Sequence, residues 1–258
     1  MRRINGKYYD NNRRFYQQNE IRELCKDIYQ TLISKDIHAV ICKKTVDTNQ
    51  GKGVKKYTIS SLEDLIKLFE ENASEKNFIL QEAIVQALFF SRYNPSSVNI
   101  MRLTTWKHGN EVEVFAPCLR FGVEGFVTDV AYVDGEEIVN GIGIAPDGQI
   151  MKKGISMNGD RFSFDFDDRA VPQWDNVIKT VKEGHRYLEY FAIVAWDMIV
   201  DKNGQVICIE YNLNSPGSIV YQMCHGPFAG DWTDELLSFL KDKQNQERYL
   251  PKMIRTKK

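Results

Sequence analysis

The spacing of apolar residues along the chain predicts an alternation of helices and short strands. Apolar residues recur at helical intervals in 19–34, in 172–189 and again in 232–240. Ser60 and Glu63 have the spacing of a capping box, which opens a further helix. Shorter apolar runs bounded by turn residues predict strands at 38–44, 54–59, 78–85, 98–106 and 111–121. Mixed antiparallel strands with flanking helices indicate an α+β fold.

The order of these elements suggests three parts. Residues 1–37 are expected to form an N-terminal helical segment with basic flanks. Residues 38–86 read as strand, loop, strand, helix and strand, which predicts a small lobe. Residues 87–258 are expected to form a larger lobe, in which the Gly- and Asp-rich stretch 122–170 is predicted as mostly loops with weak strands.

One predicted strand, 111–121, places a charge at the end of an apolar face. Alternate residues of a strand point to the same side of the sheet. One side would carry Val112, Val114, Ala116, Cys118 and Arg120. An arginine that ends an apolar face requires an anionic partner, for example a phosphate.

The segment 191–217 reads as two apolar strands joined at Asn203-Gly204. This dipeptide favours a two-residue hairpin turn, because both turn positions need positive φ. Such a turn pairs Lys202 with Gln205 and places Asp197 opposite Glu210.

The length of the turn decides which side chains meet on this hairpin. In the two-residue register, Asn212 shares the face of Glu210, about 7 Å further along the strand. A four-residue loop would place Asp197 opposite Cys208, which still lies on that face. A three-residue loop is expected to destroy the arrangement.

Two neighbouring carboxylates on an apolar surface need a cation or water. Burying them together is costly unless a cation neutralises them. Carboxylate and amide oxygens are the ligands of Mg²⁺, which usually binds substrate phosphates as well. The hairpin therefore suggests a magnesium–nucleotide site, although an open face with Asp197 and Glu210 solvated explains the pattern equally well.

Composition excludes several other classes of function. The 258 residues carry a formal net charge of −1, whereas dedicated nucleic-acid binders usually show a basic excess. No apolar run approaches the roughly 18 residues of a membrane-spanning helix, and no secretory signal is present. The five cysteines lack Cys-x-x-Cys spacing, which fits a reducing cytoplasm. His185 and the Cys224-His225 pair are more typical of structural residues than of catalytic ones.

The loop 45–53 joins two predicted strands and is a candidate phosphate-binding loop. Gly51 and Gly53 allow the backbone to approach a ligand, and Lys44 and Lys52 add positive charge. Backbone N–H groups in such loops can bind phosphates, although a plain turn has the same composition. No Gly-Lys-Ser/Thr leads into a helix, so the loop is not a Walker A motif.

The order of these features resembles the ATP-grasp superfamily over residues 38–240. A lysine at a strand end leads into a Gly-rich loop, followed by a Leu-Gln-Glu-Ala-Ile strand, strand arginines and an Asp…Glu-x-Asn hairpin. The details resemble the sugar-transfer-associated ATP-grasp family, which occurs with bacterial surface-polysaccharide genes. The most specific strings are Asn94-Pro95-Ser96-Ser97-Val98-Asn99-Ile100-Met101-Arg102, Leu119-Arg120-Phe121-Gly122, Trp196-Asp197 and Ile209-Glu210-Tyr211-Asn212.

The resemblance implies a role for each matching residue. Lys44 would contact the ATP phosphates, with Lys43 as the alternative. Arg102 and Arg120 would stabilise the transferring phosphoryl group and an acyl phosphate. The flexible lid over the phosphates would comprise Gly51, Lys52 and Gly53. The adenine hinge would comprise Gln81, Glu82, Ala83 and Ile84. The Mg²⁺ ligands would be Asp197, Glu210 and Asn212.

The resemblance also implies a fold, in which a small α+β lobe and a larger mixed-sheet lobe clasp ATP. The chain departs from the family in three respects. Thr45 replaces the usual proline, and 83–110 contains no acidic residue to bind the ribose. The usual N-terminal domain is expected to be reduced or absent, and a partner protein could supply it.

The implied activity is an ATP-dependent ligase that joins a carboxylate to an amine through an acyl phosphate. The acceptor would be a small molecule or glycan-linked, in the making or decoration of cell-surface polysaccharide. Two alternatives use the same residues: a phosphotransferase, and a non-catalytic nucleotide-binding scaffold.

Overall fold

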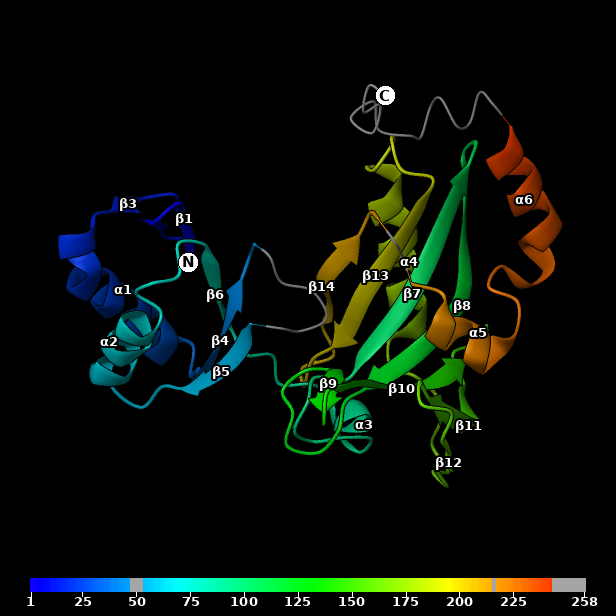
Figure 1. Cartoon of the computed structure of the whole chain (residues 1–258), viewed down its shortest axis with the longest axis horizontal. Helices are drawn as coiled ribbons and strands as arrows, with labels where there is room; N and C mark the ends of the chain where they lie inside the picture. The colour runs from blue at the N-terminus through cyan, green and yellow to red at the C-terminus, as the bar shows by residue number, and fades with distance from the viewer. Residues whose placement is uncertain (47–52, 215–216, 243–258) are drawn as a thin grey trace. The chain divides into compact units, whose positions relative to one another are not determined.

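The computed structural model describes residues 1–46, 53–214 and 217–242, and it divides the chain into two compact units (Figure 1). The first unit is Met1–Ile84 and the second is Val85–Lys258. Residues 1–37 therefore belong to the same unit as the expected small lobe, and the boundary follows Ile84 instead of residue 86.

The first unit is a six-stranded sheet with the strand order β3-β2-β1-β6-β4-β5. Helices α1 and α2 pack side by side against this sheet (Figure 1). Its core is built from Leu24 of α1, Leu65 of α2 and Phe78 of β6, among others. The elements are β1 Arg2–Ile4, β2 Lys7–Tyr9, β3 Phe15–Tyr16, η1 Gln18–Glu20, α1 Ile21–Ser34, β4 Ala39–Lys44, β5 Val54–Thr58, α2 Leu62–Glu71 and β6 Phe78–Glu82.

The N-terminal residues contribute strands as well as the expected helix. Strands β1 to β3 are two or three residues long, too short for a period of two to be recognised in the sequence. Arg3 of β1 is buried, and its Nη1 donates to the carbonyl oxygens of Ala73 at 3.0 Å and Glu75 at 2.5 Å. It thereby satisfies carbonyl groups that follow the end of α2.

The capping box of α2 lies one residue later than predicted. Ser61 is the N-cap, and its Oγ accepts from the backbone N–H of Asp64 at 3.2 Å. The Asp64 carboxylate accepts from the N–H of Ser61 at 2.8 Å. The Ser60–Glu63 assignment is therefore wrong by one position, because an Asp at N3 closes the box in place of the Glu.

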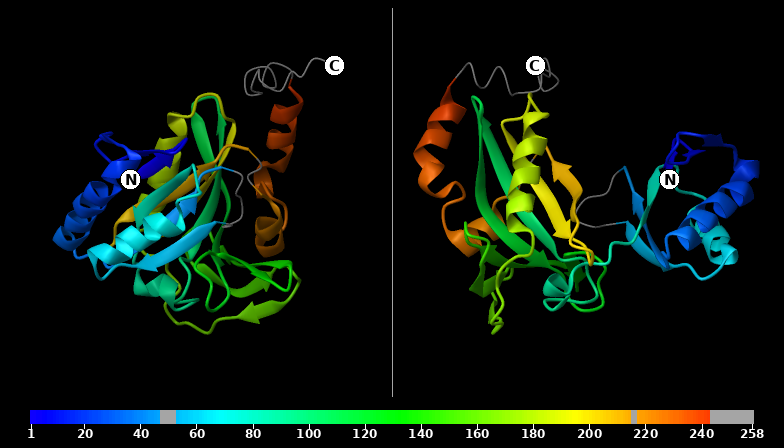
Figure 2. Two further views of the ribbon diagram at one scale, coloured as in Figure 1. Left: turned by 60° about the vertical axis from the view of Figure 1, so that its left-hand side comes forward. Right: turned by 180° about the vertical axis from the view of Figure 1, so that it is seen from behind.

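The second unit is built on a sheet with the order β12-β11-β10-β8-β7-β13-β14, in which β9 pairs with β10. Helix α4 covers one face, and α5 packs on the other face against β8, β10 and β11. The right-hand view of Figure 2 shows α4 in front of the sheet. The strands are β7 Ile100–His108, β8 Glu111–Phe121, β9 Val130–Val133, β10 Glu136–Ile144, β11 Ile150–Ser156, β12 Arg161–Ser163, β13 Ile193–Val200 and β14 Val206–Asn212. The helices are α3 Leu88–Ser91, α4 Trp174–Arg186, α5 Ile219–His225, η2 Gly230–Trp232 and α6 Thr233–Lys241.

The stretch 122–170, predicted as mostly loops with weak strands, holds four strands, β9 to β12. Several of its glycines lie inside these strands. A Cβ on Gly141 of β10 would lie 2.3 Å from Val220 of α5, and one on Gly154 of β11 would lie 2.0 Å from Phe162. These glycines serve close packing and not chain reversal.

A β-bulge divides the predicted continuous face of β8. Arg102 pairs with Cys118 but Thr104 pairs with Phe115, so β8 holds an extra residue near Ala116, whose φ is +33°. Val114 therefore packs in the core under α4, whereas Arg120 lies on the α5 side. The prediction that one face runs unbroken from Val112 to Arg120 is wrong.

Among the residues that the structure describes, no helix combines the length and the apolar character needed to cross a membrane.

Candidate active site

The β13–β14 hairpin pairs Asp197 with Glu210, as predicted. The predicted two-residue turn is wrong: Asp201 donates its N–H to Gln205 at 3.0 Å, which leaves the three-residue loop 202–204. Gly204 takes φ +80°, as a loop of this length requires.

A β-bulge explains how a three-residue loop preserves the pairing. Met198 pairs with Cys208 but Asp197 pairs with Glu210, so Ile209 is the extra residue on β14. The bulge restores the register that the longer loop had shifted by one. The expectation that a three-residue loop destroys the arrangement is therefore wrong.

Asp197 lies in a row of charged side chains that crosses three strands. It is opposite Glu210 of β14 on one side and opposite Arg102 of β7 on the other. Arg102 Nη1 donates to both carboxylate oxygens of Asp197, at 2.6 and 2.7 Å. A buried carboxylate needs such a partner, and here the strand arginine supplies it.

A tyrosine from α5 completes the surroundings of Arg102. The Nε–H of Arg102 donates to the hydroxyl oxygen of Tyr221 at 3.0 Å, and Thr104 Oγ1 donates to the same oxygen at 3.1 Å. Burial opposes the charge of Arg102, but Asp197 and Tyr221 hold the pKa of the guanidinium above its ordinary value. Burial raises the pKa of Tyr221 to about 12, which keeps the hydroxyl protonated. A single tyrosine in the apolar run 219–225 has no feature that sequence analysis could single out.

Arg120 also has a carboxylate partner, half-buried, which the sequence did not reveal. Its Nη2 lies 2.7 Å from Asp129 Oδ2. Because Arg120 pairs with Ile100, and Arg102 pairs with Cys118, the two arginines are diagonal neighbours on one face. Burial raises the pKa of Asp129, and the charge of Arg120 acts against that rise. Only the acidic residue types of 122–170 hinted at such a partner, with nothing to select Asp129.

The segment 94–99, which carries the most specific part of the family resemblance, holds the loop of Asp129 in place. Ser96 Oγ accepts from the backbone N–H of Gly125 at 3.0 Å. Asn99 is fully buried and donates to two backbone carbonyl groups. Together with the bond from the N–H of Gly122 to Ser97 Oγ and that from the N–H of Val98 to the carbonyl of Val127, both at 3.3 Å, the contact from Ser96 connects the loop that precedes Asp129 to the segment 94–99.

Lys44, the predicted phosphate ligand, forms an ion pair with Glu75 in the first unit. Its N–H donates to the carbonyl of Gly53 at 3.2 Å, across the ends of the β4–β5 connection. The lid residues Gly51 and Lys52 lie outside the described residues, and Gly53 is half-buried. Lys43, the alternative, precedes Lys44 on β4 and thus points to the other face of the sheet.

The predicted hinge residues span the end of β6: Gln81 and Glu82 are its last two residues, and Ala83 and Ile84 follow it. Gln81 and Glu82 are exposed and pair with Ile41 and Val40 of β4. The N–H of Ala83 donates to the carbonyl of Ala39 at 3.0 Å, so the sheet already uses this group. Ile84 is half-buried.

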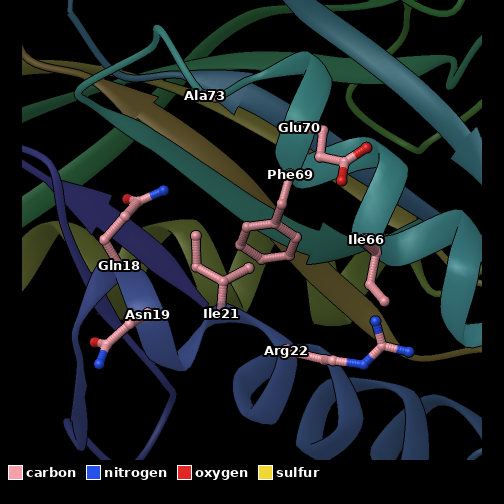
Figure 3. Close-up of a pocket in the computed structure, with 8 residues that line it drawn as sticks. All are labelled: Gln18, Asn19, Ile21, Arg22, Ile66, Phe69, Glu70 and Ala73. Atoms are coloured by element: carbon pink, nitrogen blue, oxygen red, sulfur yellow. The ribbon is translucent and has the colours of Figure 1, made fainter.

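A cavity of about 310 Å³ lies between α1 and α2 (Figure 3). Its lining residues are Gln18, Asn19, Ile21, Arg22, Ile66, Phe69, Glu70 and Ala73. None of the predicted site residues lines it, and the figure shows Phe69 in the middle of its wall.

The histidines that the sequence suggested as structural form hydrogen bonds with protein groups. His185 Nδ1 lies 2.6 Å from Thr105 Oγ1 and its Nε2 lies 2.9 Å from the carbonyl of Phe191. Burial lowers the pKa of His185. His225 Nε2 lies 2.7 Å from the carbonyl of Pro117, and burial raises the pKa of Cys224 to about 11. His225, bonded to Pro117, therefore does not activate the Cys224 thiol.

Comparison with protein families identifies the chain. Residues 11–230 match the family described as sugar-transfer associated ATP-grasp. The chain belongs to this ATP-grasp family. The resemblance inferred from the sequence is thus confirmed. No curated protein matches the chain.

A solved structure confirms the α+β ATP-grasp fold, and two others are less similar. D-alanyl-alanine synthetase A from Vibrio cholerae superposes with a TM-score of 0.51 at 10% identity, over 96% of this chain and 61% of that one. The D-alanine-D-alanine ligase from Coxiella burnetii gives 0.42 at 11% identity, over 87% and 48%. N5-carboxyaminoimidazole synthetase from Staphylococcus aureus gives 0.42 at 12% identity, over 72% and 37%. The chain thus spans less than two thirds of each.

ATP-grasp enzymes generally use ATP with Mg²⁺. The β13–β14 hairpin carries carboxylate and amide oxygens, which are the kind of ligand that Mg²⁺ takes. Glu210 is exposed, and Asn212 lies two residues further on the same face, with its Nδ2 3.5 Å from Glu210 Oε1. Cross-strand partners such as Asp197 and Glu210 have Cβ atoms about 5 Å apart. A carboxylate has about four acceptor sites, so the two bonds from Arg102 leave capacity on Asp197.

A third oxygen donor beside Asp197 and Glu210 would have to come from the amide of Asn212. Within 1–46, 53–214 and 217–242, no group of three or more His, Cys, Asp or Glu side chains could hold a metal ion. Two carboxylates and one amide oxygen fit a hard cation that retains several waters. The residues present therefore fit Mg²⁺.

Proposed function

We propose that this ATP-grasp protein is an ATP-dependent ligase that joins a carboxylate to an amine through an acyl phosphate. The observation that carries the proposal is the row Glu210–Asp197–Arg102. In this row, carboxylate oxygens that could bind Mg²⁺ lie beside a guanidinium held in place by hydrogen bonds. Such an arrangement can neutralise the charge that develops when a phosphoryl group is transferred. The family's description as sugar-transfer associated supports an acceptor linked to sugar chemistry, and we place that chemistry in the making or decoration of cell-surface polysaccharide.

The residues divide the work of the first step. Lys44 would bind ATP phosphates, and the segment 81–84 would pair with adenine. Asp197, Glu210 and Asn212 would hold Mg²⁺, which supplies charge neutralisation of the phosphates. Arg102 and Arg120 would stabilise the phosphoryl group while a carboxylate oxygen bonds to the γ-phosphorus and ADP leaves.

The second step needs no further nucleotide chemistry. The amine nitrogen attacks the carbonyl carbon of the acyl phosphate, and the C–O bond to phosphate breaks. Phosphate leaves with the bonding electrons, and the amine loses a proton to solvent. Arg102 and Arg120 would stabilise the departing phosphate as they stabilised the transferring group.

The experiment measures ADP and phosphate release with pairs drawn from a panel of sugar acids, amino acids and amines. Release is expected only when an acid and an amine are both present, and it should fall at least a hundredfold in Asp197→Asn and Glu210→Gln. Glu136→Gln, a change at an exposed acid of β10, is the matched control and should keep full activity. An ATP-binding protein that no pair stimulates would contradict the proposal, and a stable phosphorylated acceptor would show a phosphotransferase instead.

A further inference from the structure

Tyr221 contacts the proposed catalytic machinery without belonging to its metal or nucleotide ligands. Its side chain comes from α5 and is 2% exposed. The hydroxyl lies 3.0 Å from Arg102 Nε and 3.1 Å from Thr104 Oγ1, two groups of the same strand. The ring packs against Phe228, with centroids 5.6 Å apart. Tyr221 is therefore fixed both by its ring and by its hydroxyl.

The sequence of β10 allows α5 to lie close enough for this contact. A Cβ on Gly141 would lie 2.3 Å from Val220 Cγ1, and one on Gly143 would lie 3.0 Å from His225 Nε2. Any side chain at Gly141 would therefore require Val220 of α5 to move. The bond between His225 and the carbonyl of Pro117, at 2.7 Å, secures the end of α5 on the sheet.

The tyrosine determines which part of the guanidinium faces Asp197. Arginine commonly grips a carboxylate with two nitrogens in a fork. Here Nη1 alone binds both oxygens of Asp197, at 2.6 and 2.7 Å, while Nε is engaged by Tyr221. The Nε edge is thus bonded to Tyr221 and takes no part in the ion pair.

We propose that Tyr221 is a positioning residue, which holds Arg102 away from a two-nitrogen grip on Asp197. This role rests on the proposed function, because it matters only if Asp197 binds metal and Arg102 meets a phosphoryl group. Without the hydroxyl, Arg102 can rotate to bind Asp197 through Nε and Nη together. That rotation would change the edge of the guanidinium that Arg102 presents to the phosphoryl group.

The first test uses Tyr221→Phe, which keeps the ring and removes only the hydroxyl. Hydrogen exchange of the Arg102 Nε–H is followed by ¹⁵N NMR, with the signal assigned from its loss in Arg102→Lys. Exchange should quicken at least tenfold in Tyr221→Phe and stay unchanged in Tyr187→Phe, a matched control at a side chain 88% exposed. Equal exchange in the wild type and Tyr221→Phe would overturn the proposal.

The second test separates positioning from simple support of the fold. With the acid–amine pair that the wild type uses, kcat of Tyr221→Phe should fall about tenfold to a hundredfold, the range for one hydrogen bond to a charged group. KM for ATP should change less than twofold, and the urea midpoint of unfolding should remain close to that of Tyr187→Phe. An unchanged kcat, or a fall matched by loss of folded protein, would overturn the positioning role. No turnover by the wild type would contradict the ligase itself, and Nε–H exchange would then decide alone whether Tyr221 holds Arg102.

Discussion

The two units each pair a proposed ATP-site cation with a carboxylate, but in opposite environments. In the second unit, the Arg102 and Asp197 side chains are 10% and 7% exposed, and both belong to adjacent strands. In the first unit, the Lys44 and Glu75 side chains are 38% and 32% exposed, and Glu75 lies in a connection between α2 and β6. An ion pair between a cation and a carboxylate is thus buried and rigid in the second unit, whereas in the first unit it is partly solvated and can rearrange.

This difference teaches which charges are fixed before substrate arrives. Breaking a buried ion pair leaves an uncompensated charge at a cost of about 3–5 kcal/mol, whereas a solvated pair contributes about 0–1 kcal/mol. Arg102 is therefore held in place, while Lys44 can exchange Glu75 for an anionic ligand at little cost. The following changes test this contrast, from the largest expected effect to the smallest.

Replacing Arg102 with methionine should produce the largest loss of stability. The variant leaves Asp197 buried without its cation, and we expect the free energy of unfolding to fall by about 3–5 kcal/mol. Urea unfolding followed by tryptophan fluorescence reports on this unit, because it contains all four tryptophans of the chain. The double variant Arg102→Met/Asp197→Leu should recover most of the loss. A cost below about 1 kcal/mol in the single variant would show that the pair behaves like a surface pair.

Acidification should weaken the second unit through His185, another buried polar group. Burial lowers the pKa of His185 below 6.5, so the unfolded chain binds the proton more readily than the folded one. The contribution of neutral His185 to the free energy of unfolding is fully present above about pH 6.5. As the pH drops from there towards the folded pKa, the free energy of unfolding falls by up to about 1.4 kcal/mol per pH unit.

The measurement is the free energy of unfolding between pH 7 and pH 5, in the wild type and in His185→Gln. The variant should show a shallower decline, and His38→Gln, at a side chain 77% exposed, should follow the wild type. His225 has a lowered pKa as well but is present in every protein compared, so the difference isolates His185. Parallel curves would contradict the assignment.

Removing the charge of Glu75 should have the smallest effect on stability. Because its pair with Lys44 is partly solvated, we expect Glu75→Gln to change the free energy of unfolding by less than about 1 kcal/mol. It should lower the Kd for ATP a few-fold, since the Glu75 carboxylate no longer competes for Lys44, and high salt should reduce the difference. Calorimetric titration with ATP measures this, with Glu71→Gln at an exposed position of α2 as control. Weaker ATP binding in Glu75→Gln would contradict the claim that Lys44 exchanges Glu75 for an anionic ligand.

The sequence revealed the parts of the fold that depend on local pattern. The 111–121 strand, the helix within 172–189 and the pairing of Asp197 with Glu210 all appear in the structure. The hairpin loop was predicted with the wrong length, because a bulge at Ile209 compensates for one residue and leaves no mark on the sequence.

Features that depend on tertiary packing could not be predicted. Gly141 reads as a loop residue until Val220 of α5 is found against it. Asp129 is one of many acids in a Gly- and Asp-rich stretch, and only the folded chain brings it to Arg120. Tyr221 lies more than a hundred residues from Arg102 in sequence, so their hydrogen bond has no local signal.

The central claim is that the Glu210–Asp197–Arg102 row supports the formation of an acyl phosphate, and an isotope measurement tests it most directly. The acid of an active acid–amine pair is labelled with ¹⁸O in its carboxylate, and the phosphate released is analysed by mass spectrometry. The account predicts that one labelled oxygen enters each phosphate, and that Glu210→Gln abolishes this transfer while Glu136→Gln retains it. Released phosphate that carries no label, or equal transfer by Glu210→Gln, would contradict the account.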